Sequence, residues 1–172
     1  MDPEYVKIWG KQHVTADNII WTSRGGKLYF LFIRRKENPM EIALPGGFVE
    51  HTETIMDTAV RELMEETGVE MTNLCSYKYA FYEDDIYRDL RARMITHVFA
   101  GNILYNDLMY IINEPSTISM LDPEVQSVHS VAYEDFHGYN FRADHRLLVE
   151  RFIDETCLGD SKVAEFFRSI RK

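Results

Sequence analysis

Hydrophobic residues along this chain fall into short runs that have the length and composition of strands. The clearest run is KLYFLFIR at residues 27–34, which lies between Gly25-Gly26 and the polar stretch RRKENP. Comparable runs predict further strands at residues 5–9, 14–21, 41–44, 71–82 and 94–100. We therefore expect a sheet to form much of the core.

One stretch instead has the period of a helix. Met56, Ala59, Val60 and Leu63 are spaced i, i+3, i+4 and i+7, which predicts a helix with a single buried face. Gly68 is a natural stop, and Thr52 or Thr54 is suited to cap the first turn.

Two later segments complete the outline. Residues 161–172 predict a last amphipathic helix, whose apolar positions are Val163, Phe166, Phe167 and Ile170. Residues 102–122 hold the apolar run LMYII and then NEPST, which we interpret as a further strand followed by a connection over a site. Without repeats or long linkers, the pattern predicts one α/β domain spanning residues 1–172.

Composition narrows the class of protein. The 172 residues are 45% hydrophobic, enough for a sizeable core, and their formal charge is −9. An acidic chain disfavours a nucleic-acid groove. The N-terminus lacks the apolar run of a signal peptide, and no 18 apolar residues follow one another, so we expect no membrane partner. The two cysteines, Cys75 and Cys157, are too few for a disulfide framework, which fits a cytoplasmic protein.

Negative charge gathers on one flank of the helix predicted from Met56 to Leu63. At about 100° per residue, Glu62, Glu65 and Glu66 fall within an arc of roughly 100° beside the apolar face. Their mutual repulsion is unfavourable, and Mg²⁺ or Mn²⁺ would offset it because these ions prefer oxygen ligands. The alternative is a solvated acidic face. On the same helical wheel, Arg61 is expected to point away from this flank.

The stretch around this helix carries a family resemblance. GFVEHTETIMDTAVRELMEETGV at residues 47–69 resembles the complete signature of the Nudix hydrolases. The resemblance implies an α/β/α sandwich with a mixed sheet between helices, divalent metal held by Glu62, Glu65, Glu66 and the Gly46 carbonyl, and hydrolysis of a nucleoside diphosphate linked to another group. It also implies that Arg61 holds the loop through Glu53, and that residues 130–133 form the last strand.

Two further segments resemble a narrower group within this family. Residues 81–99 and residues 141–153 resemble Nudix domains of the ADP-ribose pyrophosphatase group, especially those fused to nicotinamide mononucleotide adenylyltransferase. The first segment departs from that pattern at Ala92, where the group has glycine. In the second segment a helix is expected, with His145 as a hydrogen-bond partner at its start. The implied reaction converts ADP-ribose to AMP and ribose 5-phosphate.

Several other residues are candidates for the site. Many family members take a general base from a glutamate downstream of the signature, which here would be Glu114 or Glu124. The candidates for substrate binding are Arg34 or Arg35, Glu50, Arg88, Arg91 and Arg93. For the arginines at 88, 91 and 93 the alternative is pairing with nearby acidic residues on the surface.

Other functions remain open at this point. A dinucleoside polyphosphate is an alternative substrate, because Tyr87 lies near the place where a tyrosine marks that group, and a nucleotide sugar is another. A regulator that binds ADP-ribose without hydrolysing it is an alternative from a different class. The resemblance also leaves a homodimer open.

Overall fold

The computed structural model describes residues 12–88, 92–114, 121–157, 165 and 167–169. The strands within these ranges are β1 (Gln12–Arg24), β2 (Lys27–Arg35), β3 (Asn38–Ala43), β4 (Gly46–Phe48), β5 (Leu74–Glu83), β6 (Arg93–Ile103), β7 (Val125–Ala132) and β8 (Asn140–Phe141). The predicted strand at residues 5–9 lies outside the described residues. The run 27–34 is confirmed as a strand, and so are the runs at 14–21 and 94–100.

These strands form one mixed sheet. The order along it is β5-β6-β1-β2-β3-β8, with β4 also paired to β1 and β7 also paired to β2. β1 is parallel to β6 but antiparallel to β2 and β4. Because β4 pairs with β1 at Asp17 and Gly46, the loop before the helix is fixed to the centre of the sheet.

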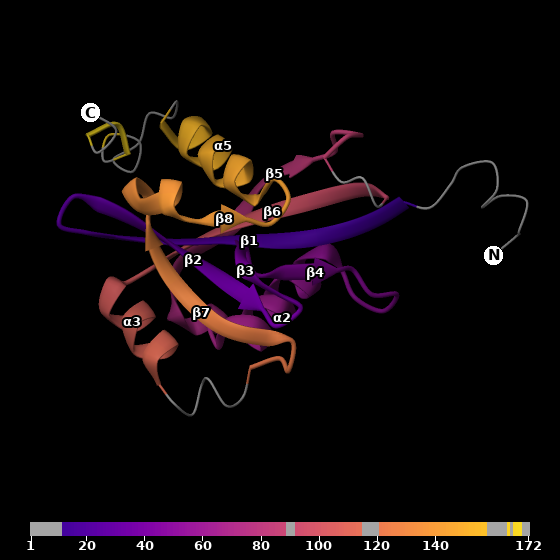
Figure 1. Cartoon of the computed structure of the whole chain (residues 1–172), viewed down its shortest axis with the longest axis horizontal. Helices are drawn as coiled ribbons and strands as arrows, with labels where there is room; N and C mark the ends of the chain where they lie inside the picture. Colours follow the sequence, from indigo (N-terminus) through magenta and orange to yellow (C-terminus); the bar gives the residue numbers. More distant parts are fainter. Residues whose placement is uncertain (1–11, 89–91, 115–120, 158–164, 166, 170–172) are drawn as a thin grey trace, which may run out of the picture.

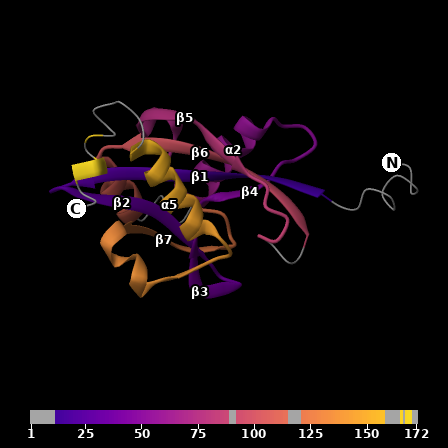
Figure 2. The same cartoon turned by 90° about the horizontal axis from the view of Figure 1, so that it is seen from above.

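Helices cover both faces of the sheet. α2 (Ile55–Thr67) and α3 (Tyr105–Asn113) lie on one side, and α5 (His145–Cys157) lies on the other (Figure 1). Seen from above, α5 lies over β1 and β2 (Figure 2). The expected α/β/α sandwich with a mixed sheet is confirmed.

The run at residues 27–34 is hydrophobic throughout because β2 is buried on both of its faces. Phe30 and Phe32 pack with Phe152 of α5, whereas Leu31 packs with Leu63 of α2 and Leu108 of α3. Phe167, which belongs to the predicted last helix, is also fully buried against Trp21. Val163, Phe166 and Ile170 lie outside the described residues.

α2 begins and ends where the sequence predicts. Thr54 caps it, accepting a hydrogen bond from the Asp57 N–H at 3.2 Å, and Gly68 ends it with φ of 73°. Its buried face, however, differs in part from the predicted one. Met56 is 42% exposed, whereas Thr58 and Glu66 are buried. Ala59 and Leu63 of the predicted face are fully buried, so the apolar spacing located the helix and the centre of its buried face but not the polar residues buried beside it.

Three other elements differ from the predictions in type or in their bounds. Residues 105–113 form a helix rather than a strand, and Leu108 and Ile111 turn its apolar side to the core. The strand expected from residue 71 starts at Leu74, after a short 3₁₀ helix, η1 (Met71–Asn73). The strand expected at 130–133 runs over β7, and η2 (Tyr133–Gly138), another 3₁₀ helix, follows it. Among the described residues, no helix has the length and apolarity needed to cross a membrane.

Candidate active site

A cavity of about 570 Å³ lies where α2, β1 and β4 meet. This volume is within the usual range for a small-molecule site. Predicted site residues that line it come from five separate segments: Arg35, Gly46, Glu50, Glu62, Glu65, Glu66, Arg88 and Glu124. Tertiary structure thus brings together residues that are spread over 90 positions of the sequence, from 35 to 124.

The acidic side chains of α2 differ in exposure. Glu66 is almost completely buried, Glu62 is 14% exposed and Glu65 is 48% exposed, so the flank runs from the core to the mouth of the cavity. Glu66 Oε2 accepts a hydrogen bond from the Gly46 N–H at 2.8 Å. This hydrogen bond joins Glu66, the buried end of the acidic flank, to β4.

Glycines at 46 and 47 allow this close approach. A Cβ atom on Gly47 would lie 2.2 Å from Glu62 Oε1. A Cβ atom on Gly46 would lie 2.3 Å from Asp17 Oδ1 and 2.4 Å from the Ala16 carbonyl oxygen. A side chain at Gly46 would meet backbone, and one at Gly47 would displace the Glu62 carboxylate, so both carboxylates lie directly against glycine backbone.

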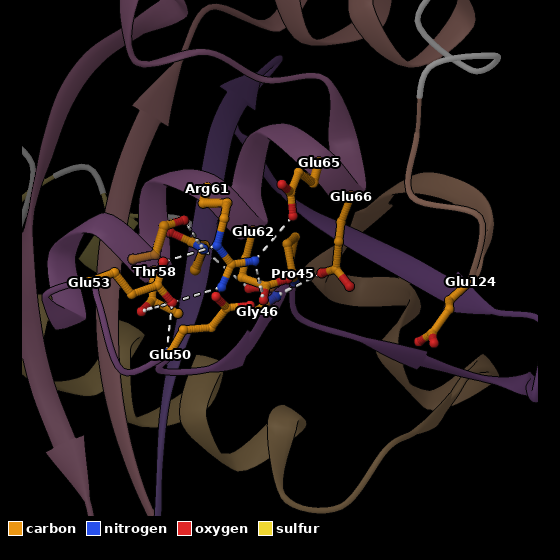
Figure 3. Close-up of polar contacts among 12 residues, drawn as sticks. Pro45, Gly46, Glu50, Glu53, Thr58, Arg61, Glu62, Glu65, Glu66 and Glu124 are labelled. Carbon is orange, nitrogen blue, oxygen red and sulfur yellow. Dashed lines mark hydrogen bonds and ion pairs between the residues drawn. The ribbon is translucent and has the colours of Figure 1, made fainter.

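Arg61 lies among the carboxylates (Figure 3). It contacts Glu53 through two hydrogen bonds of 2.8 and 3.0 Å, which agrees with the pairing that the family resemblance implies. It also reaches Glu62 at 2.8 Å and Glu65 at 3.1 Å. The expectation that Arg61 points away from the acidic flank is therefore wrong, because Glu65 lies one turn along the same helix face.

Arg35 is the second cation among these carboxylates. Its Nη2 donates to Glu66 Oε1 and, at 3.1 Å, to the Gly46 carbonyl oxygen. Its Nη1 lies 3.3 Å from Glu124 Oε2. The backbone fixes this last residue in place, since the Glu124 carbonyl accepts from the Lys36 N–H at 2.8 Å.

Burial makes negative charge costly here. It raises the pKa of Glu66 to about 8, although Arg35 opposes the shift, and it raises the pKa of Glu62. It also raises the pKa of Asp17 to about 7, against the charge of Arg88. At the outer edge, hydrogen bonds from Arg61 lower the pKa of Glu53 to about 2. The inner carboxylates therefore need positive charge to be ionised at neutral pH.

The donor groups suit a hard divalent cation in kind, because carboxylates and a main-chain carbonyl are oxygen ligands. As the side chains stand, the described Asp, Glu, His and Cys residues form no group of three arranged to hold an ion. The contacts explain this, since Arg35 engages Glu66 while Arg61 engages Glu62 and Glu65. Glu62, Glu65, Glu66 and the Gly46 carbonyl are the oxygen groups that would hold the cation.

The far wall of the cavity is formed by the segment before α5. Arg88 donates to both oxygens of Asp144, at 2.9 and 2.8 Å. His145 Nδ1 accepts from the Leu44 N–H at 2.8 Å, which confirms His145 as a hydrogen-bond partner at the start of the helix. Burial lowers the pKa of His145 to about 4, so the ring is neutral and free to accept.

Three predicted residues are not among the described residues that line the cavity. Arg34 lies on the opposite face of β2, where burial and then the Arg34 charge lower the pKa of His129. Arg93 pairs with Asp84 at 3.5 Å, and Glu114 follows the last turn of α3. Arg91 lies outside the described residues. The structure lends no support to a site role for Arg34, Arg93 or Glu114.

Asp17 is a cavity residue that the sequence analysis missed. It is 6% exposed and lies within the part of β1, residues 15–20, in which every residue is buried. Its neighbour Asn18 donates to the carbonyl oxygens of Pro45 at 3.3 Å and Ala59 at 2.9 Å, which joins the glycine loop to α2. Two adjacent polar residues, Asp17 and Asn18, inside a predicted strand were the signal that could have identified this part of the site.

Comparison with known proteins finds a domain family that matches this chain. The NUDIX domain family matches residues 11–152. A stretch of 97 residues is 40% identical to a protein named ADP-ribose pyrophosphatase from Methanocaldococcus jannaschii. That stretch covers 55% of this chain and 53% of the relative, so the match spans about half the length of that curated protein.

Solved structures share the fold at lower identity. The NUDIX domain of Shewanella oneidensis NrtR, complexed with ADP-ribose, matches with a TM-score of 0.69 and 22% identity, over 90% of this chain and 93% of that one. A bifunctional NMN adenylyltransferase/ADP-ribose pyrophosphatase from Francisella tularensis, complexed with AMP and a Mn ion, matches with a TM-score of 0.55 and 24% identity. That match covers 88% of this chain and 45% of the other.

Proposed function

This chain belongs to the NUDIX domain family, and from that premise we propose that it is a metal-dependent pyrophosphohydrolase that converts ADP-ribose to AMP and ribose 5-phosphate. One observation carries the proposal. Three glutamates of α2 face a cavity that also holds the cationic side chains of Arg35 and Arg88, so metal ligands and phosphate-binding groups share one space.

The reaction adds water to one phosphorus atom of the diphosphate and breaks the bond from that phosphorus to the bridging oxygen. Glu62, Glu65, Glu66 and the Gly46 carbonyl would hold the cation. A divalent ion bound there supplies positive charge to the phosphate oxygens and lowers the pKa of the attacking water. Arg35 lies within the same cavity and is suited to bind the phosphate oxygens, and Arg88, held by Asp144, adds positive charge to the wall.

Glu124 is the better candidate for the general base. It lines the cavity, whereas Glu114 is not among the described lining residues. Its side chain is 73% exposed, so it has room to approach a water molecule at the mouth. Glu50, at another part of the wall, is a candidate for contact with the substrate.

The assignment of ADP-ribose as substrate is supported by the relative from Methanocaldococcus jannaschii, which is named ADP-ribose pyrophosphatase. A panel of ADP-ribose, a diadenosine polyphosphate and a nucleotide sugar, incubated with Mg²⁺ and resolved by chromatography, tests the assignment. AMP and ribose 5-phosphate should form fastest from ADP-ribose. Faster cleavage of another member would replace the substrate, and binding of ADP-ribose without release of AMP would contradict hydrolysis.

Glu66→Gln tests the role of the metal ligands. This variant should keep its fold by circular dichroism and lose turnover by at least about 100-fold, since even the outer partners of metal ligands are worth 10- to 100-fold. Glu134→Gln is the control, because it removes the same charge from an exposed residue of η2. An undiminished rate of Glu66→Gln in saturating Mg²⁺ would disprove the assignment.

A further inference from the structure

Arg35 bridges the groups that the proposed function assigns to metal binding and to proton abstraction. Its Nη2 atom bonds Glu66 and the Gly46 carbonyl oxygen, and its Nη1 atom bonds Glu124. A single planar cation thus lies where two of the proposed metal ligands converge. A divalent ion cannot take both ligands while the guanidinium group stays in this position.

We propose that Arg35 is an exchangeable internal cation: it neutralises Glu66 while no metal is bound, competes with the divalent ion for Glu66 and the Gly46 carbonyl, and moves to a substrate phosphate when displaced. This inference rests on the proposed function. It assigns Arg35 a positioning role in assembling the site, and it makes metal and diphosphate bind cooperatively.

Burial explains why Glu66 needs such a partner. Its side chain is 2% exposed, and its second oxygen already accepts from the Gly46 N–H. An ionised carboxylate left without a cation in that position would be strongly unfavourable. Arg35, with its side chain 18% exposed, reaches Glu66 from the cavity and keeps a path back to the solvent.

Arg35 is better placed to leave than Arg61. Arg61 is anchored outside the metal ligands by two hydrogen bonds to Glu53, whose side chain is 12% exposed. The anchor of Arg35 outside the metal ligands is Glu124, which lies at 3.3 Å and is 73% exposed, so that contact is weak. Of these two cations, Arg35 is therefore the one that exchanges.

The diphosphate gives the displaced group a new partner. A guanidinium binds phosphate oxygens through two parallel hydrogen bonds, and Arg35 belongs to the wall of the cavity. Metal binding frees Arg35 for the phosphate, and the phosphate in turn holds Arg35 away from Glu66. By linkage, each ligand must then raise the affinity of the other.

Manganese binding to the full chain tests the competition directly. Free Mn²⁺ is measured by electron paramagnetic resonance for the unmodified protein, Arg35→Gln and Arg142→Gln. Arg142 lines the same cavity but pairs with Glu37 at 2.8 Å, so its substitution removes the same charge without touching Glu66. If Arg35 closes the site in about nine molecules of ten, Arg35→Gln should bind Mn²⁺ about tenfold more tightly.

The same titration with the α,β-methylene analogue of ADP tests the coupling. The analogue should tighten Mn²⁺ binding more in the unmodified protein and Arg142→Gln than in Arg35→Gln. Equal or weaker binding by Arg35→Gln, relative to Arg142→Gln, overturns the inference and leaves the proposed function standing. No Mn²⁺ binding by any of the three proteins, with or without the analogue, overturns both.

A measurement on the unmodified protein covers the case in which Arg35→Gln does not fold. The ¹⁵Nη2 resonance of Arg35, assigned through Arg35→Lys, should lose its protection from hydrogen exchange when Mg²⁺ is added, because Nη2 carries the hydrogen bond to Glu66. Protection that persists at saturating Mg²⁺ would show that Arg35 still bonds Glu66, and the inference would be overturned.

Discussion

Arg88 donates hydrogen bonds to both carboxylate oxygens of Asp144, a residue 56 positions further along the chain. The two side chains are only 7% and 15% exposed. They belong to the two segments whose sequences resemble the same group of Nudix domains. The ion pair therefore fixes the connection between β5 and β6 to the start of α5, across the wall of the cavity.

Breaking this pair from one side should be costly, because the remaining charge stays buried. We expect Asp144→Asn to lower the free energy of unfolding by about 3 kcal/mol, measured by urea denaturation. Arg88→Gln combined with Asp144→Asn should cost less than the sum of the single changes. Arg142→Gln, which breaks the exposed pair with Glu37, should cost no more than about 1 kcal/mol. Additive single effects would show that the pair contributes no coupling.

The adjacent glycines should respond differently to the same substitution. Gly46→Ala would bring a Cβ atom to 2.8 Å from the Asp17 Cα and 2.4 Å from the Ala16 carbonyl, both backbone atoms. We expect this variant to lose about 1 to 3 kcal/mol of stability. Gly47→Ala meets the flexible carboxylate of Glu62 instead, so it should keep its stability but lose activity about 10- to 100-fold.

Thermal unfolding and turnover measured side by side separate these two effects. Gly138→Ala is the control, since an added Cβ there meets no atom within 4 Å and should change neither quantity. Full activity of Gly47→Ala would mean that Glu62 does not need its observed position.

His145 should contribute to acid sensitivity. Its pKa is about 4 in the folded chain and 6.5 when unperturbed, so between these values the unfolded state binds the extra proton. Its contribution is complete above pH 6.5 and is lost as the pH falls toward 4, by at most about 3 kcal/mol. His145→Asn, which retains an acceptor for the Leu44 N–H, should show a shallower decline in stability from pH 7 to 4.

Urea denaturation across this pH range provides the measurement. Carboxylates that titrate in both proteins cancel in the comparison. His137→Asn, which replaces an exposed residue of η2, should follow the curve of the unmodified protein. A His145→Asn curve parallel to that of the unmodified protein would exclude the proposed origin of the acid sensitivity.

Local pattern accounts for the elements that were predicted correctly. Thr54, Gly68 and the apolar residues between them fixed the length of α2 because caps and period act within one or two turns. The glutamate flank was identified for the same reason. The spacing correctly placed Ala59 and Leu63 on the buried side, but it could not show that Thr58 and Glu66 are buried as well, because the parts of the chain packed around α2 bury them.

Prediction failed where distant residues decide the outcome. LMYII within α3 has enough apolar residues for either a strand or a helix, and Leu108 and Ile111 are helical because they pack with Leu31 and Leu63. Likewise, nothing near Arg35 or Arg34 says which one faces the cavity. Arg35 does so because β2 turns that face toward α2.

By itself, the sequence determined the kind of chemistry: a helix with carboxylates at 62, 65 and 66, a glycine loop before it and a strand-rich chain around it. These features depend on residues close together in the chain, so they can be read without coordinates. The tertiary structure alone decided which charges meet. Arg35 with Glu66, Arg88 with Asp144, and Asp17 beside Gly46 come together only because the sheet and its two helical layers bury them side by side.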